Sequence, residues 1–356
     1  MGLTFETCFE SVTLNSFTAI SRLDNVRLWE SIVSNSEYLP VVYTNSSIEF
    51  QWRYQQWHGG DWLDLSNIIL WDNRPVAAWP ISLVLKNCEY SLSSQGLPVL
   101  PPLFVADCPP STRKRVTRHC LDLLEMLTER FEIKSWSSAE PFSNSVGLTD
   151  WHLDSMVRGA SCKITHDLFV NLQLSIEEIK SRFRKSYKSL LNSGLRHYSV
   201  NVLSAVDNTI WESFRTLHRN AAGRETRSTE TWDIHYNDIK EQRAILVYLL
   251  DGAGQMDGAG FFNYTRDEGL YAVAAYNRLA FDRPLGHLVQ YRAIEELKKR
   301  GIRWYKIGPR PYRTERPEPS AKEISIGDFK QGFASHTFPC YRMTYSSKNI
   351  DQLRKD

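Results

Sequence analysis

The chain has 356 residues, of which 42% are hydrophobic and 24% are charged, and these are the proportions of an ordinary globular protein. That length predicts two domains, and we place them at residues 1–150 and 151–356. A formal net charge of +2 excludes a protein that is basic overall and binds DNA through its general charge. The six cysteines show no C-x-x-C pair and no metal-type spacing to His, which predicts reduced, mostly buried thiols and no metal site.

The N-terminal segment does not have the pattern of a secretory signal peptide. Met1–Ser11 carries acidic and polar residues where a signal peptide needs a basic and then an apolar run. No stretch reaches the ~20 consecutive apolar residues that a membrane-spanning helix requires. We therefore expect a cytoplasmic protein with no integral membrane segment.

The first half of the chain predicts a mixture of helices and strands. Apolar residues at helical spacing predict helices at Ser21–Ser34 and Arg113–Phe131. Strand-like runs lie at Ser66–Trp71, Pro75–Leu85 and Tyr90–Ser93, and the Asp72–Pro75 turn predicts a hairpin between the first two. This half contains no catalytic motif.

The second half begins with a basic amphipathic segment. Ser175–Glu178 has the S-x-x-E form of a capping box, and it predicts one helix that continues to Gly194 with an apolar stripe and a basic opposite face. Ser199–Leu203 follows as a strand. Thr209–Glu212 repeats the capping-box form and predicts the start of a second helix.

A three-stranded meander and a crossover helix come next. Short turns separate Ala244–Leu250, Met256–Tyr264 and Leu270–Tyr276, which predicts antiparallel neighbours. The pattern of Gly286–Arg300 then predicts a helix that ends on basic residues. Because a helix intervenes, we expect the strand Ile302–Ile307 to lie parallel to the strand before it.

This order of elements, together with three segments, resembles the Fem-like branch of the GNAT acyltransferase superfamily. Phe183–Gly194 resembles the family's segment of spaced Arg and Lys, Pro284–Gly301 is similar to its central helix, and Asp328–Phe333 resembles its Phe-Lys-x-Gly-Phe signature. The resemblance implies an α/β fold with a mixed sheet and two GNAT-like domains. The N-terminal domain, 1–150, would be degenerate, and 151–356 would be the acyltransferase domain.

The resemblance implies acyl transfer to an amine, and it leaves three interpretations open. The first is an N-acyltransferase that moves an acyl or acetyl group from acyl-CoA to an amine of a cell-envelope or glycan precursor. The second is an aminoacyl-tRNA-dependent Fem-type transferase acting on a peptidoglycan precursor. The third is a non-catalytic GNAT-fold module that binds an anionic ligand. The donor, the acceptor, the general base and the oligomeric state stay open at this point.

A possible CoA-binding loop precedes the predicted crossover helix. The superfamily usually places an R/Q-x-x-G-x-G/A loop there, because backbone amides and the helix dipole bind pyrophosphate. Arg283 and Gly286 fit this pattern, whereas Leu288 replaces its small last residue and Pro284 lacks an amide. We take Arg283, Gly286, His287 and Leu288 as candidate cofactor-binding residues, beside the alternative of an ordinary loop closing onto a helix.

Four residues are candidates for the chemistry. His287, in the first turn of the helix, is a candidate neutral base, because the helix dipole lowers its proton affinity; a solvent-facing His is the alternative. Lys330 and Asp328 lie in the family-like C-terminal motif, and Lys330 is suited to stabilise an oxyanion or bind phosphate. Tyr276, on the third meander strand beside Tyr271, is a candidate for the donor site or for core packing.

Two clusters are candidates for binding an anionic substrate. Arg219, Arg224 and Arg227 lie in a turn-rich segment and form a potential fork for phosphate or carboxylate. A solvated loop is the alternative. Arg310 and Tyr312 follow the last core strand, where ligand clefts commonly lie.

Overall fold

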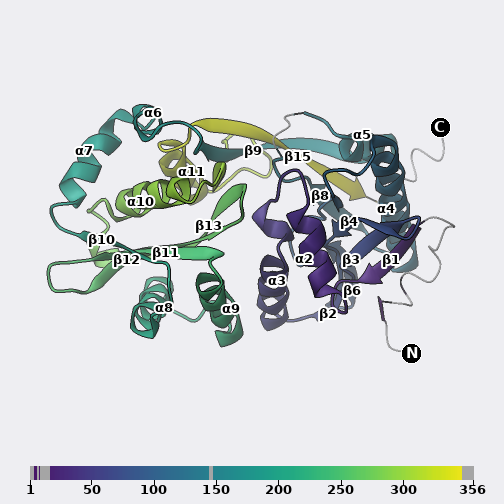
Figure 1. The fold of residues 1–356 in the computed structure, drawn as a ribbon, viewed down its shortest axis with the longest axis horizontal. Coiled ribbons are helices and arrows are strands. Elements are labelled where there is room, and N and C mark those ends of the chain that lie inside the picture. The colour runs from purple at the N-terminus through teal and green to yellow at the C-terminus, as the bar shows by residue number, and fades with distance from the viewer. Residues whose placement is uncertain (1–3, 6–7, 9–16, 144–146, 347–356) are drawn as a thin grey trace. The chain divides into compact units, whose positions relative to one another are not determined.

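The computed structural model of the chain describes residues 4, 5, 8, 17–143 and 147–346. The chain forms two compact units (Figure 1). Unit 1 is Met1–Ile164 together with Cys340–Asp356, and unit 2 is Thr165–Pro339. These bounds differ from the expected division at 150/151, because Trp151, Met343 and Tyr345 are buried in the core of unit 1. No helix in the described ranges is long and apolar enough to cross a bilayer.

Within residues 17–143 and 147–164, unit 1 combines two small sheets with four helices of more than one turn. The helices are α2 (Val26–Ser34), α3 (Asn45–Trp57), α4 (Pro110–Arg130) and α5 (Asp150–Val157), with a short 3₁₀-helix η1 (Val41–Tyr43). One sheet has the order β1 (Phe17–Ser21), β3 (Asn67–Trp71), β4 (Arg74–Trp79) and β7 (Leu103–Phe104), and the other has the order β2 (Asp61–Asp64), β5 (Ser82–Lys86) and β6 (Glu89–Ser93). Strand β8 (Ser135–Ala139) pairs with Arg342–Ser346 of β15 (His336–Ser346).

The predicted hairpin of unit 1 is confirmed, whereas one of its strands is divided. β3 and β4 pair antiparallel, and Asp72 and Asn73 have φ of 48° and 62°, the left-handed values that a tight hairpin turn requires. The predicted strand Pro75–Leu85 is wrong as a single element. It ends at Trp79, because Pro80 has no N–H for the ladder, and β5 joins the other sheet.

Unit 2 is built on one mixed sheet. Its strand order is β10 (Ser199–Leu203), β11 (Ala244–Leu250), β12 (Met256–Tyr264), β13 (Glu268–Tyr276), β14 (Trp304–Pro309) and β9 (Ser161–Asn171). Its helices are α6 (Ile176–Ser181), α7 (Lys185–Gly194), α8 (Asn208–Ala222), α9 (Thr229–Lys240), α10 (Leu285–Lys299) and α11 (Ala321–Gln331), with a 3₁₀-helix η2 (Arg278–Ala280). The meander β11–β12–β13 and the parallel pairing of β14 with β13 are as predicted.

Helices cover both faces of this sheet (Figure 1). α10 packs on β11 and β12 from one side; from the other side, α8 packs on β12 and β13 and α9 packs on β11. Each side has its own apolar core, one centred on Phe262 and Val289 and the other on Trp211 and Phe261. The alternating side chains of β12 therefore supply both cores, as expected for a strand covered on both faces.

Strands β13 and β14 separate after three paired positions. They pair only from Glu268 with Trp304 to Leu270 with Lys306. β13 then continues to Tyr276, while β14 pairs with β9 on its other edge with a register shift between Lys306 and Gly308. The two parallel strands β13 and β14 are therefore unpaired beyond Lys306, and the sheet is open between them from there to Gly308.

Three local predictions for unit 2 are wrong. The helix predicted from Ser175 to Gly194 is broken into α6 and α7, because the chain turns at Phe183 to bury that ring against Phe333. The helix predicted from Thr209 is capped instead by Asp207, whose carboxylate accepts the amides of Thr209 and Ile210. The sequence reading also missed α9, which directly follows the arginine segment.

Candidate active site

Lys330 lies at the end of α11, beside the opening between β13 and β14. A capping box fixes the start of this helix, since Ser320 Oγ accepts the amide of Glu323 and the Glu323 carboxylate accepts the amide of Ser320. Lys330 is half-buried. Its Nζ lies directly over Gly308 of β14, so close that a Cβ at position 308 would stand only 2.6 Å from it.

Gly308 allows this approach for two independent reasons. It has no side chain to occupy the space taken by Nζ, and its φ of +131° is a value that other residues rarely adopt. Gly308 is also the first residue of β14 that pairs with β9 after the register shift that follows Lys306. Bulges of this kind re-aim strands next to functional sites, and here the bulge lets the lysine reach the open part of the sheet.

The electrostatic setting of Lys330 differs from that of its neighbour Lys306. Lys306 pairs with Asp167 at 2.7 Å. Within the described residues Lys330 forms no ion pair, and its Nζ lies 5.5 Å from the ring centre of Tyr271. Burial lowers the pKa of Lys330 below its ordinary value, and the charge of Asp167 acts against that shift. A partly desolvated ammonium without a carboxylate partner is suited to stabilise a negative charge that develops during a reaction.

Three tyrosines of β13 and β14 lie in this part of the sheet, of which Tyr305 is buried and Tyr271 and Tyr276 are partly buried. The hydroxyls of Tyr271 and Tyr276 lie 3.0 Å apart, and Tyr305 donates to Gln290 Oε1 at 2.5 Å. Burial raises the pKa of all three tyrosines. The phenols are therefore neutral at pH 7. Of the two tyrosines on β13, Tyr271 faces Lys330, while the predicted Tyr276 packs over Gly258.

Asp328 and Arg310 bind each other. Arg310 Nη2 donates to Asp328 Oδ1 at 2.7 Å, its Nε donates to Gln331 Oε1 at 2.7 Å, and its Nη1 donates to the carbonyl of Pro311 at 2.8 Å. The bonds to Asp328 and Gln331 tie α11 to the residue that follows β14. The geometry therefore favours a positioning role for this pair over the predicted roles of Asp328 in catalysis and Arg310 in substrate binding.

Tyr312 belongs to the same packing. The Arg310 guanidinium lies 4.7 Å from the Tyr312 ring centre, and His166 contacts this ring edge-on at 5.2 Å. Tyr312 thus packs against Arg310, and its role in substrate binding stays a prediction.

The loop before α10 gives no support for a pyrophosphate cradle. The amides of Leu285, His287 and Leu288 already donate to the carbonyls of Arg283 or Pro284. Leu288 is 1% exposed within the apolar core, so its side chain faces no ligand. A Cβ at Gly286 would stand 3.0 Å from the Phe329 ring, which covers this turn.

The other two predicted loop residues are engaged in internal contacts. Arg283 donates to the Tyr198 hydroxyl at 3.3 Å, and this hydroxyl donates to Asp257 at 3.0 Å. His287 is enclosed by aromatic rings, with the Tyr187 ring centre 4.4 Å away and that of Phe329 at 5.0 Å.

Burial, followed by the charge of Arg184, lowers the pKa of His287 to about 4. The imidazole is therefore neutral at pH 7. Burial, and not the helix dipole invoked from the sequence, is the principal cause. A base with a pKa this low retains little proton affinity at neutral pH.

The three predicted arginines do not form one fork. Arg219 and Arg224 are exposed, and Arg219 Nη1 lies 3.7 Å from Glu225. Arg227 is 5% exposed, lies 3.5 Å from the ring centre of Trp232 and contacts His235 at 3.2 Å. The buried guanidinium serves packing between α8 and α9 and cannot share a solvent-facing ligand with the other two.

The sequence reading did not single out Gly308, Asp167, Gln290 or Tyr305. An Ile-Gly-Pro run that ends a strand was the available signal for Gly308. Of the six cysteines, Cys8, Cys108 and Cys120 are buried, so the expected burial holds for half of them. Among the described residues, no group of three or more His, Cys, Asp or Glu side chains is placed to hold a metal ion.

The comparisons with known proteins identify the fold. No protein-family model and no curated protein sequence matches the chain. The crystal structure of FemX matches with a TM-score of 0.66 and 11% identity, over 96% of this chain and 100% of that one. The chain has the fold of FemX. The predicted fold class, a mixed α/β GNAT-like fold of the Fem kind, is confirmed.

Two further solved structures share part of this fold. L-PGS from Bacillus licheniformis matches with a TM-score of 0.53 and 12% identity, over 78% of this chain and 84% of that one. The C-terminal domain of a putative lysylphosphatidylglycerol synthetase from Agrobacterium fabrum matches with a TM-score of 0.50 and 11% identity, over 77% and 84%. At these identities the similarity is one of fold, and residue roles rest on the geometry described above.

Proposed function

We propose that the protein transfers an acyl group to an amine, with Lys330 beside the reacting carbonyl. The observation that carries this proposal is the half-buried ammonium over Gly308, held at the opening between β13 and β14 without a carboxylate partner in the described part of the chain. The fold supports it, because one of the fold neighbours is named as a putative lysylphosphatidylglycerol synthetase, an enzyme whose product contains a lysyl group.

The proposed reaction forms one amide bond. The nitrogen of the acceptor amine attacks the carbonyl carbon of the donor, and the carbonyl oxygen takes up negative charge. The Lys330 ammonium stabilises that charge. The C–O or C–S bond of the donor then breaks, and the proton lost by the amine leaves with the alcohol or thiol. The Tyr271 ring, 5.5 Å from Nζ, keeps one side of the ammonium away from water.

For the donor, we favour an aminoacyl ester of tRNA over acyl-CoA. Three amides at the start of α10, those of Leu285, His287 and Leu288, already donate to carbonyls of the same turn, which leaves fewer amides for a CoA pyrophosphate. An aminoacyl ester does not need amides of this loop. The name of a fold neighbour, a putative lysylphosphatidylglycerol synthetase, is that of an enzyme whose product contains a lysyl group.

The acceptor we propose is an amine of a cell-envelope or glycan precursor, in the cytoplasm, where charged tRNA and CoA are made. A donor panel tests the function. The protein is incubated with a pool of radiolabelled aminoacyl-tRNA or with acetyl-CoA, each in the presence of nucleotide-linked amino sugars, peptidoglycan precursors and amine-bearing lipids. Labelled amide product and released tRNA, or free thiol, report transfer.

Lys330→Ala is the decisive variant, with Lys322→Ala on the exposed side of the same helix as its control. We expect Lys330→Ala to lower kcat at least a hundredfold with an unchanged melting temperature, and Lys322→Ala to have no effect. Full activity of Lys330→Ala would remove this residue from the mechanism. No product from either donor class would favour the non-catalytic binding module.

A further inference from the structure

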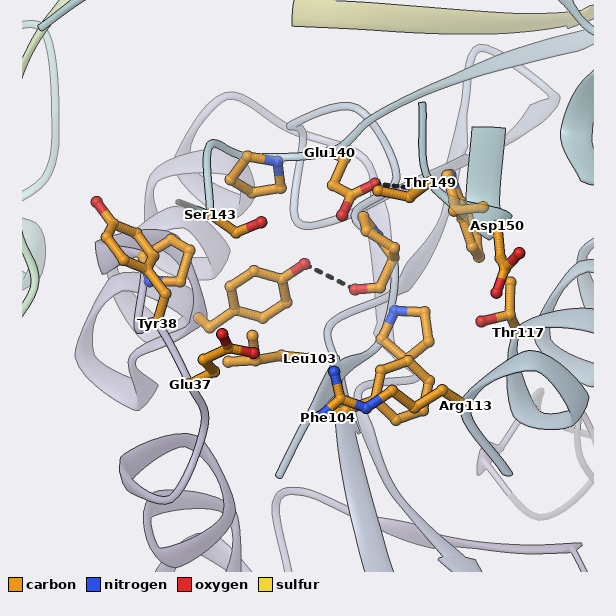
Figure 2. Close-up of a pocket in the computed structure, with 16 residues that line it drawn as sticks. Glu37, Tyr38, Leu103, Phe104, Arg113, Thr117, Glu140, Ser143, Thr149 and Asp150 are labelled. Atoms are coloured by element: carbon orange, nitrogen blue, oxygen red, sulfur yellow. Dashed lines mark hydrogen bonds between the residues drawn. The ribbon is translucent and has the colours of Figure 1, made fainter. Parts of the chain in front are cut away.

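Unit 1 contains a cavity of about 360 Å³, and none of the residues assigned to transfer lines it. It is bounded by residues that follow α2, by the Pro101–Phe104 segment, by the first part of α4, and by residues between 140 and 143 and at 149–151 (Figure 2). Its volume is near the lower end of the range of small-molecule sites. All the residues that line the cavity belong to unit 1.

The walls of the cavity are flat and apolar. Tyr43, Phe104 and Trp151 contribute rings, and four proline residues and Leu103 also line the cavity. The Tyr43 hydroxyl donates to the carbonyl of Pro101 at 2.7 Å, which fixes the position of this ring. Rings held in this way offer faces against which the C–H groups of a small saturated ring can pack.

The polar groups of the cavity are mainly acceptors. The carboxyl groups of Glu37, Glu140 and Asp150 line it. Glu140 Oε2 accepts a hydrogen bond from Thr149 Oγ1 at 2.5 Å, which holds this carboxyl at the upper edge (Figure 2). Burial raises the pKa of Glu140 to about 7. His152 Nδ1, 3.5 Å from the same carboxyl, has its pKa lowered to about 4 by burial, so no neighbouring imidazolium neutralises it at pH 7.

Arg113, a cation that lines the cavity, already donates hydrogen bonds within the protein. Arg113 Nε donates to the carbonyl of Cys108 at 2.9 Å, and its Nη2 donates to the carbonyls of Val105 and Ala106 at 3.2 and 2.9 Å. These bonds hold the loop that leads into α4. Most of the guanidinium's hydrogen-bonding capacity is therefore used within the protein, and the cavity as a whole favours ligands that donate hydrogen bonds and carry positive charge.

Thr117 adds a hydroxyl to the polar groups of the cavity. It is 5% exposed, and its hydroxyl is turned into the cavity (Figure 2). A hydroxyl at the wall of a cavity can both donate a hydrogen bond to a ligand and accept one from it.

We propose that this cavity binds an amino sugar. An ammonium group satisfies the carboxyl groups of Glu37, Glu140 and Asp150, the ring hydroxyls pair with Thr117 and the same carboxyl oxygens, and the C–H face of the sugar packs on the aromatic walls. This site goes beyond the transfer proposed for Lys330. Binding is measured without any acyl donor, so failure of one proposal leaves the other intact.

Titration calorimetry on the full chain tests the proposal with three sugars of nearly equal shape. Glucosamine carries the ammonium group, N-acetylglucosamine has lost its charge, and glucose has a hydroxyl in its place. We expect glucosamine to bind at least tenfold more tightly than the other two. Equal affinities for the three sugars, or no binding of glucosamine, would overturn the proposal.

Variants locate the binding. Thr117→Val removes only the hydroxyl and keeps the shape of the side chain, and Glu140→Gln removes only the charge; each should weaken glucosamine binding at least fivefold. Lys330→Ala, in unit 2, should leave the affinity unchanged. Unchanged binding by both Thr117→Val and Glu140→Gln would refute this location, even if glucosamine bound elsewhere. A melting curve for each variant confirms that it is folded.

Discussion

Lys330 Nζ occupies the space in which a side chain at position 308 would begin. The distance from this nitrogen to a Cβ built on Gly308 would be 2.6 Å, well inside normal contact. The two residues come from α11 and β14 and are far apart in sequence. The position of the ammonium is therefore set as much by what residue 308 lacks as by the lysine itself.

Gly308→Ala should displace Lys330 and destabilise unit 2. The new Cβ excludes Nζ from its position, and the φ of +131° strains an alanine by about 1–3 kcal/mol. We expect kcat to fall at least tenfold with a lower melting temperature. Gly252→Ala is the control, because a Cβ there meets nothing within 4 Å.

A double-mutant cycle separates the two effects of Gly308→Ala. In a Lys330→Ala background only the backbone strain remains, because the clashing Nζ is gone. Gly308→Ala should then cost less unfolding free energy, measured by urea denaturation, than it costs in the wild type. Equal costs in both backgrounds would show that Lys330 does not contact position 308.

Asp167→Asn should move the alkaline limb of the activity profile to lower pH. Burial lowers the pKa of Lys330, and the Asp167 carboxylate opposes that change. Removing the carboxylate lowers the pKa further, so the ammonium is lost at a lower pH as the pH rises. The profile of kcat against pH between 7 and 10 measures the limb. A limb that stays in place would exclude titration of Lys330 as its origin.

Asp328→Asn should keep most of the activity and the same pH profile. An asparagine still offers an oxygen to the Arg310 guanidinium, which Asp328 Oδ1 now accepts at 2.7 Å. Arg310→Ala removes both bonds that tie α11 to the end of β14 and should lower kcat more strongly. If Asp328 were the general base, Asp328→Asn would instead abolish turnover and the acidic limb of the profile.

Much of the fold could be predicted from the sequence because its elements carry strong local signals. The meander has apolar strands separated by short polar turns, and α10 ends on basic residues and on Gly301, whose φ is +76°. The break between α6 and α7 had no such signal. Ile179, Phe183 and Tyr187 keep helical spacing across it, and only the burial of Phe183 against Phe333 forces the turn.

The site could be predicted only in part, for a physical reason. Lys330 was found through its motif, but Gly308 takes its importance from a register shift in β14 that arises when β9 and β14 pair. The pairing of Arg310 with Asp328 likewise depends on where α11 docks. Arg227 was predicted to bind a ligand at the surface, because α9 was not predicted. The Trp232 ring of α9 covers the Arg227 guanidinium.

Arg227→Ala should destabilise the protein, whereas Arg224→Ala should not. The buried Arg227 lies over Trp232 and contacts His235, so its loss leaves a cavity and removes a cation–π contact, at a cost of about 2–3 kcal/mol. Arg224 is exposed, and its removal should change the unfolding free energy by less than about 0.5 kcal/mol. Urea denaturation of both variants measures the difference. Equal stabilities would return Arg227 to the candidate ligand-binding residues.

Glu140 should make the stability of the protein fall as the pH rises from about 4.5 to about 7. Burial raises the pKa of Glu140 from 4.5 to about 7 in the folded chain. Below pH 4.5 both states hold the proton, and above it the unfolded chain releases the proton while the folded chain keeps it. The stabilisation is therefore complete below 4.5 and is lost as the pH passes 7, by up to about 3 kcal/mol.

Comparison with Glu140→Gln isolates this contribution. The amide stays neutral at every pH and still accepts from Thr149, so the variant should match the wild type near pH 4.5 and be more stable at pH 8. His152, with a pKa lowered to about 4, loses stability in the opposite direction, as the pH falls below 6.5, but it is present in both proteins. Unfolding free energies from urea denaturation at pH 4.5, 6 and 8 give the difference directly. Parallel curves for the two proteins would show that Glu140 is already ionised in the folded state, and a solvated carboxylate of that kind would not need a cationic ligand in the cavity.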